Sequence, residues 1–400
     1  MEIIANTLAT GYGALTLAAR RAWMAGALAL GMLVVVSAWT DAAGQTTQPL
    51  RVTLDQQDRI LTLEMGPFDL PANADHHGVP QPLPHVGPVP AAGYVHGYWL
   101  EVVDAQGRQV PRDVIHHINI ITPDRRELFS NIMLRLGAAG RETGEIRLPR
   151  LLGHPVEEGQ QVMLAGMLHN PTNTSYEGVR IRVHMPFTPA DAFIKPITVY
   201  PIYMDVMPPA SIHEYDLPPG RSEQSWEGSP EVPGRLLGVG GHLHKYGVAL
   251  RLEDVTAGRV IWEVAPEVDA EGNVLSMPTK RFFWTLGVPL RPDHTYRLTA
   301  VYENPTGETI PGGAMGTLGG IFRPSSGYAW PALDRQHPDY LLDVQITERT
   351  LPGHPHAHGA EHEHAEMADP AAEHDHGAMT DAAADHDHSA PATPADAHQH

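Results

Sequence analysis

The chain has 400 residues, a net charge of −20 at pH 7 and no cysteine. Without a thiol it forms no disulfide, Cys-ligated zinc site or iron–sulfur cluster. Its possible metal ligands are carboxylates, 14 methionines and 25 histidines. The acidic balance argues against a nucleic-acid partner, because nucleic acids are bound by basic surfaces.

Residues 1–44 have the features of an export signal. Arg20 and Arg21 precede an apolar run over residues 22–40, and small residues lie just beyond it at 42–44. Basic residues before an apolar stretch keep the N-terminus in the cytoplasm and direct the downstream chain across the membrane. We predict an apolar helix that is either a cleaved signal peptide or a membrane anchor through residues 22–40. The rest of the chain is then extracytoplasmic, in the periplasm or at the cell surface.

Residues 45–350 have the pattern of many short strands. Apolar and polar residues alternate cleanly over residues 179–185, runs such as 114–121 and 260–264 are strand-like, and none of the region has a convincing helical period. Alternation with period two is typical of half-buried strands. We therefore predict an all-β fold of two antiparallel β-sandwich domains, over residues 45–200 and 201–350, with the boundary in a proline-rich stretch.

Residues 351–400 form a low-complexity tail of Ala, Asp, Glu, Pro and His that holds ten acidic residues and no Lys or Arg. Such a composition buries too little apolar surface to fold, so we predict disorder. Eleven histidines lie here, several as His-x-His pairs. Imidazoles beside carboxylates bind divalent copper, nickel or zinc weakly. The tail is either a metal buffer or a solubilising extension.

The segment Gly240–Gly247 contains the motif His242-Leu243-His244, which we place at the start of a β-strand. Residues i and i+2 of a strand face the same side, so these two imidazoles would be able to bind one metal ion together. Gly240, Gly241 and Gly247 would leave that ion uncrowded. The alternative is a pair of surface histidines on an edge strand.

Met315 is the candidate partner for that pair, because it lies in a glycine-rich segment after a strand. Two imidazoles and a thioether form a soft, low-coordinate set that suits cuprous copper. The alternative for Met315 is a filler of the hydrophobic core.

A second histidine set lies in the first predicted domain. His116 and His117 are adjacent, and His169 ends an apolar run. Neighbouring residues of an ideal strand face opposite sides, so His116 and His117 can act together only at a strand end or a bulge. Three imidazoles suit copper or zinc. Four histidines of the proline-rich stretch before this set, His76, His77, His85 and His96, are expected to be exposed in loops.

The order of these motifs resembles the type II copper, ascorbate-dependent monooxygenases, the family of peptidylglycine α-hydroxylating monooxygenase and dopamine β-monooxygenase. The matching segments are 113–117, 167–169, 242–247 and 312–315. The resemblance covers about residues 50–325, and only the metal motifs in it are specific. It implies jelly-roll-like sandwiches and two copper ions per chain.

The resemblance also implies the roles of the ligands. His116, His117 and His169 would hold a copper that donates electrons. His242, His244 and Met315 would hold the copper that binds dioxygen and abstracts hydrogen from substrate. The expected activity is an exported copper-dependent monooxygenase that hydroxylates a small or apolar substrate with O₂ and an external one-electron reductant such as ascorbate.

The chain departs from the family in three respects. It lacks the disulfides of the animal members, Gly240 replaces an arginine that helps hold the substrate carboxylate, and residues 317–319 replace an Asn and a Tyr. A peptide ending in glycine is therefore a poor candidate substrate. The alternative function is a non-catalytic copper-binding or copper-handling protein on the same scaffold, and a third is an exported structural β protein.

Overall fold

The computed structural model describes residues 47–140 and 145–348. The predicted export segment, residues 1–44, and the His-rich tail, residues 351–400, lie outside these residues. The described chain consists mainly of antiparallel strands, so the prediction of an all-β, sandwich-like fold is confirmed. No helix of the described ranges is long and apolar enough to span a membrane.

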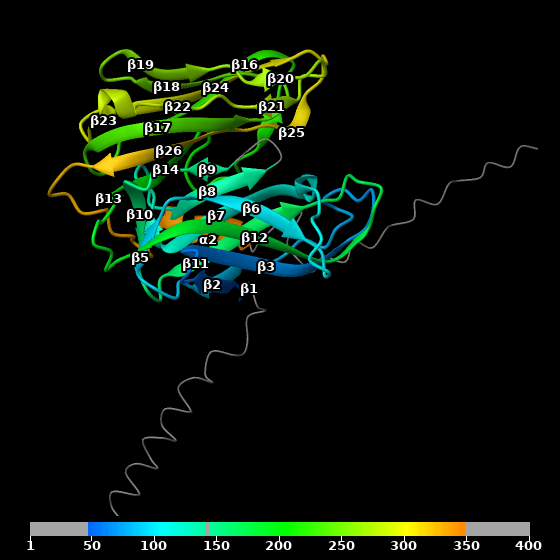
Figure 1. The fold of residues 1–400 in the computed structure, drawn as a ribbon. Helices are drawn as coiled ribbons and strands as arrows, with labels where there is room; N and C mark the ends of the chain where they lie inside the picture. Colours follow the sequence, from blue (N-terminus) through cyan, green and yellow to red (C-terminus); the bar gives the residue numbers. More distant parts are fainter. Residues whose placement is uncertain (1–46, 141–144, 349–400) are drawn as a thin grey trace, which may run out of the picture. The chain divides into compact units, whose positions relative to one another are not determined.

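Two sheets contain the strands up to residue 198 (Figure 1). One sheet has the order β1 (Gln48–Pro49), β4 (His85–Pro88), β11 (Gln161–Leu168), β7 (Ile115–Arg126) and β8 (Met133–Gly140). The other has the order β13 (Ile197–Thr198), β10 (Leu152–Val156), β5 (Gly93–Val95), β12 (Tyr176–Pro189), β3 (Ile60–Leu70) and β2 (Arg51–Asp55). In this second sheet β6 (Gly97–Val103) pairs with β12 and with β9 (Ile146–Arg147).

These two sheets enclose the first hydrophobic core. Ile118 and Ile120 of β7, Leu63 and Met65 of β3 and Val183 of β12 are all fully buried in it. The alternating residues of each strand point inward, as the period-two pattern predicts. Burial of apolar area is the main stabilising term here, because no disulfide is available.

The strands from residue 200 form a second pair of main sheets (Figure 1). The first contains β14 (Tyr200–Asp205), β26 (Gly316–Pro324), β17 (Gly234–Leu243) and β22 (Lys280–Arg281), with β23 (Val288–Leu290) also on β17. The second contains β16 (Gly220–Gly228), β24 (Tyr296–Asn304), β18 (Gly247–Asp254) and β19 (Arg259–Val264). Two small pairs complete this half, β15 (Tyr215–Leu217) with β25 (Ile310–Ala314) and β20 (Glu267–Val268) with β21 (Val274–Ser276).

The second core lies between these sheets and includes Leu318 and Phe322 of β26 and Leu298 and Tyr302 of β24. Leu128 and Phe129, from the loop between β7 and β8, also belong to it. The sheets thus change at residues 198–200, but side chains of the first half complete the second core. A domain boundary near residue 200 and a jelly-roll topology both stay predictions.

The prediction that residues 45–350 contain no helix is wrong. Short 3₁₀ turns occur at Arg112–Val114 and Phe283–Thr285, and α2 spans Pro338–Thr347. His337 caps α2 by accepting a hydrogen bond from the Asp339 N–H at 3.2 Å.

The sequence of α2 lacks a clear helical pattern of apolar residues, because one of the positions on its buried face is occupied by a charged residue. Tyr340 and Val344 pack on Ile121 and Met133, but the buried residue between them is Asp343. Asp343 is tolerated there only because it pairs with Arg135 of β8, and a sequence pattern does not show that pairing.

Candidate metal centre

His116 and His117 lie on a bulge at the start of β7. On the neighbouring strand β11, Met167 pairs with His117 and Leu168 pairs with Ile115, so His116 is an extra residue. A bulge re-aims the side chains beside it, and the two Nδ1 atoms lie 3.2 Å apart. The pair thus lies at one of the two places where joint action is geometrically possible, and its binding of a metal stays a prediction.

His169 joins this pair directly after the end of β11. Its N–H donates to the Val114 carbonyl at 3.1 Å. Its ring centre lies 5.3 Å from that of His116, and the rings of His116 and His117 are 5.4 Å apart. Imidazoles that share one ion at metal–nitrogen distances of about 2 Å have ring centres roughly 5 to 6 Å apart. The fold therefore brings the three predicted histidines into one cluster centred on His116.

His76 is a fourth member of this cluster that sequence reasoning missed. It is half-buried, and its ring centre lies 5.9 Å from that of His116. The Gln81 side chain holds the loop there, because it accepts from the Leu168 N–H and donates to the Leu168 carbonyl. The His76-His77 dipeptide, which repeats the His116-His117 pattern, was the available signal.

The expectation of exposed loop positions is also wrong for His85 and His96, which are buried. One ring nitrogen of His96 contacts the Leu152 carbonyl at 2.7 Å and the other contacts the Thr188 hydroxyl at 2.8 Å. These partners come from distant strands, so the proline-rich sequence around the two histidines does not reveal them. Among the four, only His77 is exposed.

The His242-Leu243-His244 motif ends a strand rather than starting one, which corrects the sequence prediction. His242 is the next-to-last residue of β17, and His244 lies in the turn before β18. Tyr246 turns the chain there with a φ of 69°. The glycines before the motif masked the strand, but pairing with β26 along its length overrides their low propensity. The two ring centres are 5.1 Å apart.

Tyr302 links this motif to Met315. Its buried hydroxyl accepts from the N–H of His244 at 2.9 Å and from the N–H of Met315 at 3.1 Å, and it donates to the Met315 carbonyl. Burial raises the pKa of Tyr302 to about 12, so the hydroxyl keeps its proton at neutral pH. Both backbone segments are therefore held on one side chain from the opposite sheet.

The register between β17 and β26 also places the His242-Leu243-His244 motif beside Met315. His242 pairs with Thr317, and Leu243 pairs with Gly316, the residue after Met315. His242, His244 and Met315 are all half-buried. Within residues 47–140 and 145–348, however, no three His, Cys, Asp or Glu side chains are placed so that they would together hold one ion. The histidines meet in pairs, and Met315 is tied to the second pair through its backbone.

The three glycines around the motif have different surroundings. A Cβ on Gly241 would meet Leu250 at 2.3 Å, and one on Gly247 would meet Leu243 at 2.8 Å. These two glycines therefore allow close packing of the core. Gly240 instead lines a cavity.

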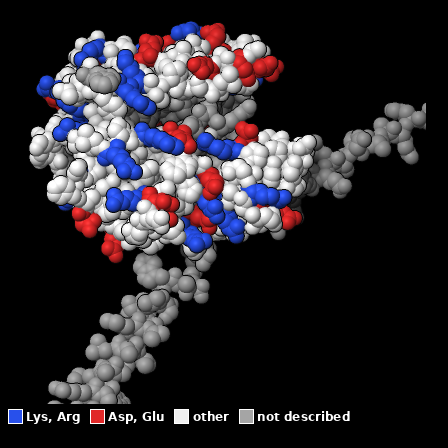
Figure 2. All heavy atoms as spheres, viewed as in Figure 1, with Lys and Arg blue, Asp and Glu red and all other residues white. Residues whose placement is uncertain are grey.

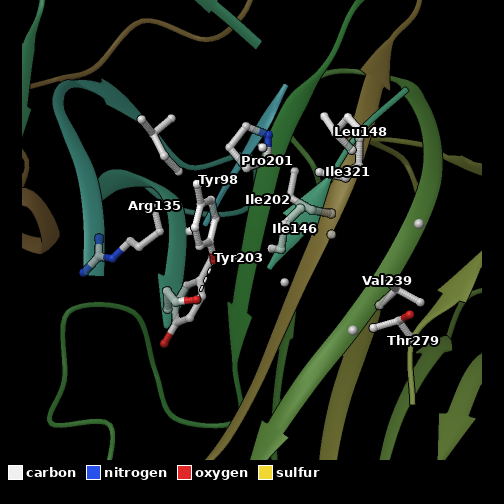
Figure 3. Close-up of a pocket in the computed structure, with 18 of the residues that line it drawn as sticks. Tyr98, Arg135, Ile146, Leu148, Pro201, Ile202, Tyr203, Val239, Thr279 and Ile321 are labelled. Carbon is white, nitrogen blue, oxygen red and sulfur yellow. Dashed lines mark hydrogen bonds between the residues drawn. The ribbon is translucent and has the colours of Figure 1, made fainter. Parts of the chain in front are cut away.

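This cavity has a volume of about 360 Å³ and lies on the outer face of the sheet that contains β14, β26 and β17 (Figure 3). Paired residues of neighbouring strands point to the same face, so the registers define three rows across this face. In the order β14, β26, β17 the rows are Pro201, Ile321, Gly238; Tyr203, Gly319, Gly240; and Asp205, Thr317, His242. All but Asp205 line the cavity, which therefore extends from the Gly238 row to His242.

The opposite wall of the cavity comes from the first half of the chain. Tyr98, Ile146 and Leu148 contribute apolar surface (Figure 3), and Asn119 of β7 lies two residues after His117. Side chains two apart on a strand share a face. The strand that carries the His116-His117 pair thus also forms part of the cavity wall.

Asp205 anchors a polar group that sequence reasoning missed. Its carboxylate accepts from the Tyr203 hydroxyl at 2.6 Å and contacts the His213 Nδ1 at 2.8 Å. Asp205 lies in the same row as His242, with Thr317 between them. No motif in the sequence connects these residues, because they meet only through strand pairing.

No family model and no curated protein matches the chain. Among solved structures it is similar to PNGase F, a glycosylasparaginase from Flavobacterium meningosepticum, with 10% identity over 66% of this chain and 96% of that chain and a TM-score of 0.34. A chain of Sulfolobus Turreted Icosahedral Virus is similar with 9% identity over 75% of this chain and 98% of that chain, at a TM-score of 0.30. Likenesses this distant carry no argument about function.

Proposed function

We propose that the chain is an exported copper-dependent monooxygenase that hydroxylates a small or apolar substrate with O₂ and an external one-electron reductant such as ascorbate. The observation that carries the proposal is the position of the cavity. Its wall includes His242 on one side and Asn119, from the strand of His116 and His117, on the other. A substrate in the cavity would therefore contact the second histidine group and lie against the strand that carries the first.

The donor sets fit copper. His116 and His117 would hold one ion, since the 3.2 Å between their Nδ1 atoms is close to the separation of about 3.3 Å for two ligands of one tetrahedral ion. His169 would complete this set after its side chain rotates, because the three rings do not converge on one point in the described part of the chain. His242, His244 and Met315 would hold the second, because two imidazoles with a thioether favour the cuprous state. Copper bound there would supply dioxygen binding and one-electron chemistry.

The chain's own residues would supply position and exclusion of water. Tyr302 holds the backbone of two ligands at one point, which limits their freedom when no ion is bound. Ile146, Leu148 and Ile321 give the cavity an apolar wall, which would favour an apolar substrate over water. Gly240 and Gly319 in the middle row leave room for a substrate.

The proposal is tested by copper content, X-ray absorption of the cuprous protein and O₂ consumption with ascorbate. We expect two coppers per chain after weakly bound tail copper is removed by a chelator, one of them with a sulfur neighbour. His244→Ala and Met315→Ile should abolish copper-dependent O₂ consumption, and Met315→Ile should also remove the sulfur signal.

A copper-handling protein would give a different result. It would bind copper with or without Met315 and show no O₂ consumption coupled to a substrate. Zinc in place of copper at both sites would contradict both interpretations. All variants carry the same tail, because none of the substitutions touches residues 351–400.

A further inference from the structure

We propose that the cavity binds an amphipathic organic anion, with the anionic group at Lys280 and Arg281 and the apolar body along the glycine rows toward His242. The binding itself requires no metal. Only the step of naming this anion as the substrate rests on the proposed function.

The first observation is the sign of the charges on the cavity wall. Four cationic side chains line it, Arg135, Arg147, Lys280 and Arg281, against one anionic side chain, Glu145. The chain as a whole has the opposite balance, with 27 Lys and Arg against 47 Asp and Glu. Lys and Arg side chains also gather across the middle of the face shown in Figure 2. The wall is thus a local basic site on an acidic protein, which concentrates anions.

The second observation is which of these charges are already neutralised. Arg135 pairs with the buried Asp343, and Arg147 pairs with Glu145 at 2.8 Å. Within the described ranges, Lys280 contacts the neutral ring of Phe282, and Arg281 makes no ion pair with any described residue. Both are exposed. About two positive charges on the cavity wall therefore lack a counter-charge from the described protein.

The position of Arg281 gives the binding mode. Arg281 pairs with Gly238, so its side chain lies on the cavity face of the sheet, level with the Pro201, Ile321, Gly238 row. His242 lies four residues further along β17. At about 3.3 Å per residue this separation is about 13 Å along the strand. A ligand anchored at Arg281 would reach His242 with a chain of about ten atoms.

The space between these two points is apolar and open. A Cβ added to Gly319 would meet no atom within 4 Å. Ile146, Leu148 and Ile321 cover the adjoining wall. An alkyl or aryl body is favoured here, since burial of apolar surface stabilises the complex. Guanidinium groups recognise carboxylates and sulfonates in preference to neutral polar groups.

The test is calorimetric titration of the full chain, in a chelator and without added copper, with octanoate, octanesulfonate and 1-octanol. The apolar chain has seven carbons in octanoate and eight in the other two probes, so the probes differ mainly in the head group. We expect both anions to bind at least about tenfold more tightly than the alcohol. The preference should weaken as salt is raised, because the anchoring charges are exposed.

Variants locate the site. Arg281→Ala should remove most of the preference for anions, and Arg281→Lys should retain part of it. Arg323→Ala is the matched control, since Arg323 is an exposed arginine on β26 outside the cavity. Gly319→Leu should weaken all three probes about tenfold or more, because it fills the cavity at a position with no clash.

Equal binding of octanoate and 1-octanol, no binding of any probe, or a preference that survives Arg281→Ala would overturn the inference. Anion binding without copper-dependent O₂ consumption would leave the cavity assignment standing and remove the proposed function. Copper-dependent O₂ consumption without any anion preference would do the reverse.

Discussion

Tyr302 shows how a single residue positions the second candidate metal group. Its hydroxyl accepts hydrogen bonds from the N–H groups of His244 and Met315 and donates one to the Met315 carbonyl. Tyr302→Phe would remove these three hydrogen bonds. We expect a loss of about 2 to 4 kcal/mol in the free energy of unfolding and a loss of about tenfold or more in Cu(I) affinity. Urea unfolding and competition with a Cu(I) chelator measure the two effects.

Tyr215 provides the control for this change. Its ring packs on that of Tyr302 with centres 6.3 Å apart, and its buried hydroxyl makes no hydrogen bond within the described protein. Tyr215→Phe should therefore leave stability unchanged or raise it. Equal losses in the two variants would show that ring packing, and not the hydroxyl of Tyr302, holds the site.

His154 is a buried imidazole whose ring nitrogens both lack a hydrogen-bond partner in the described protein. Burial lowers its pKa to about 3, with a further lowering from Arg125 and a smaller opposing effect from the Val199 backbone. The unfolded chain takes up this proton near pH 6.5. The neutral ring therefore makes its full contribution to the free energy of unfolding above pH 6.5, and this contribution is lost as the pH falls toward 3.

We expect His154→Leu to be as stable as the parent at pH 7, or more stable by up to about 2 kcal/mol. Between pH 6 and pH 4 the free energy of unfolding of the variant should fall less steeply than that of the parent. The two slopes should differ by about 1.4 kcal/mol per pH unit, the value for one proton. Urea unfolding at pH 7, 6, 5 and 4 measures both effects. Parallel pH profiles for the two proteins would refute the assignment of a neutral buried ring.

His76 lies beside the first candidate group without having been expected there. With its ring 5.9 Å from that of His116, it is near enough to add a fourth imidazole or to orient the others. His76→Ala should weaken copper binding at this group roughly tenfold. His77→Ala is the matched control on the same loop, and equal effects of the two substitutions would assign the loss to the loop itself.

At the scale of elements, α2 is held to the first half by a buried ion pair. Arg135 forms two hydrogen bonds to the Asp343 carboxylate, and the Met133 N–H donates to the same carboxylate at 2.9 Å. Asp343→Asn leaves Arg135 buried without its counter-charge. We expect the free energy of unfolding to fall by about 3 to 5 kcal/mol, as measured by urea unfolding.

The exposed pair Arg291–Asp293, at 2.9 Å, is the comparison for this change. Asp293→Asn should alter stability by at most about 1 kcal/mol, because exposed charges are screened by water. A small effect of Asp343→Asn would mean that α2 is held by Tyr340 and Val344 alone.

At the scale of the whole molecule, bound copper should stabilise the fold. A ligand at one hundred times its dissociation constant adds about 2.7 kcal/mol per site. The parent chain should therefore gain thermal stability with Cu(I), and the double variant His117→Ala, His244→Ala should gain much less. Both proteins carry the same tail, so tail copper cancels in the comparison, and equal shifts would place the copper outside the two groups.

The sequence alone determined the β class and some strands, such as those around residues 114–121 and 179–185, and it singled out histidines that come together. These features depend on local patterns, because alternation marks strands and the adjacency of His116 and His117 leaves a strand end or a bulge for joint action. The structure has the bulge. Met315 was selected because of its glycine-rich surroundings, and strand pairing brings its backbone to His244.

Only the tertiary structure decided the rest. The place of the His-x-His motif at a strand end, the burial of His85 and His96, the approach of His76 and the α2 helix all depend on partners more than ten residues away. The cavity and its uncompensated Arg281 depend on the registers of four strands together. Local sequence carries no record of such registers, since any strand with the right alternation is able to pair at several offsets, and the packing of the whole chain selects one.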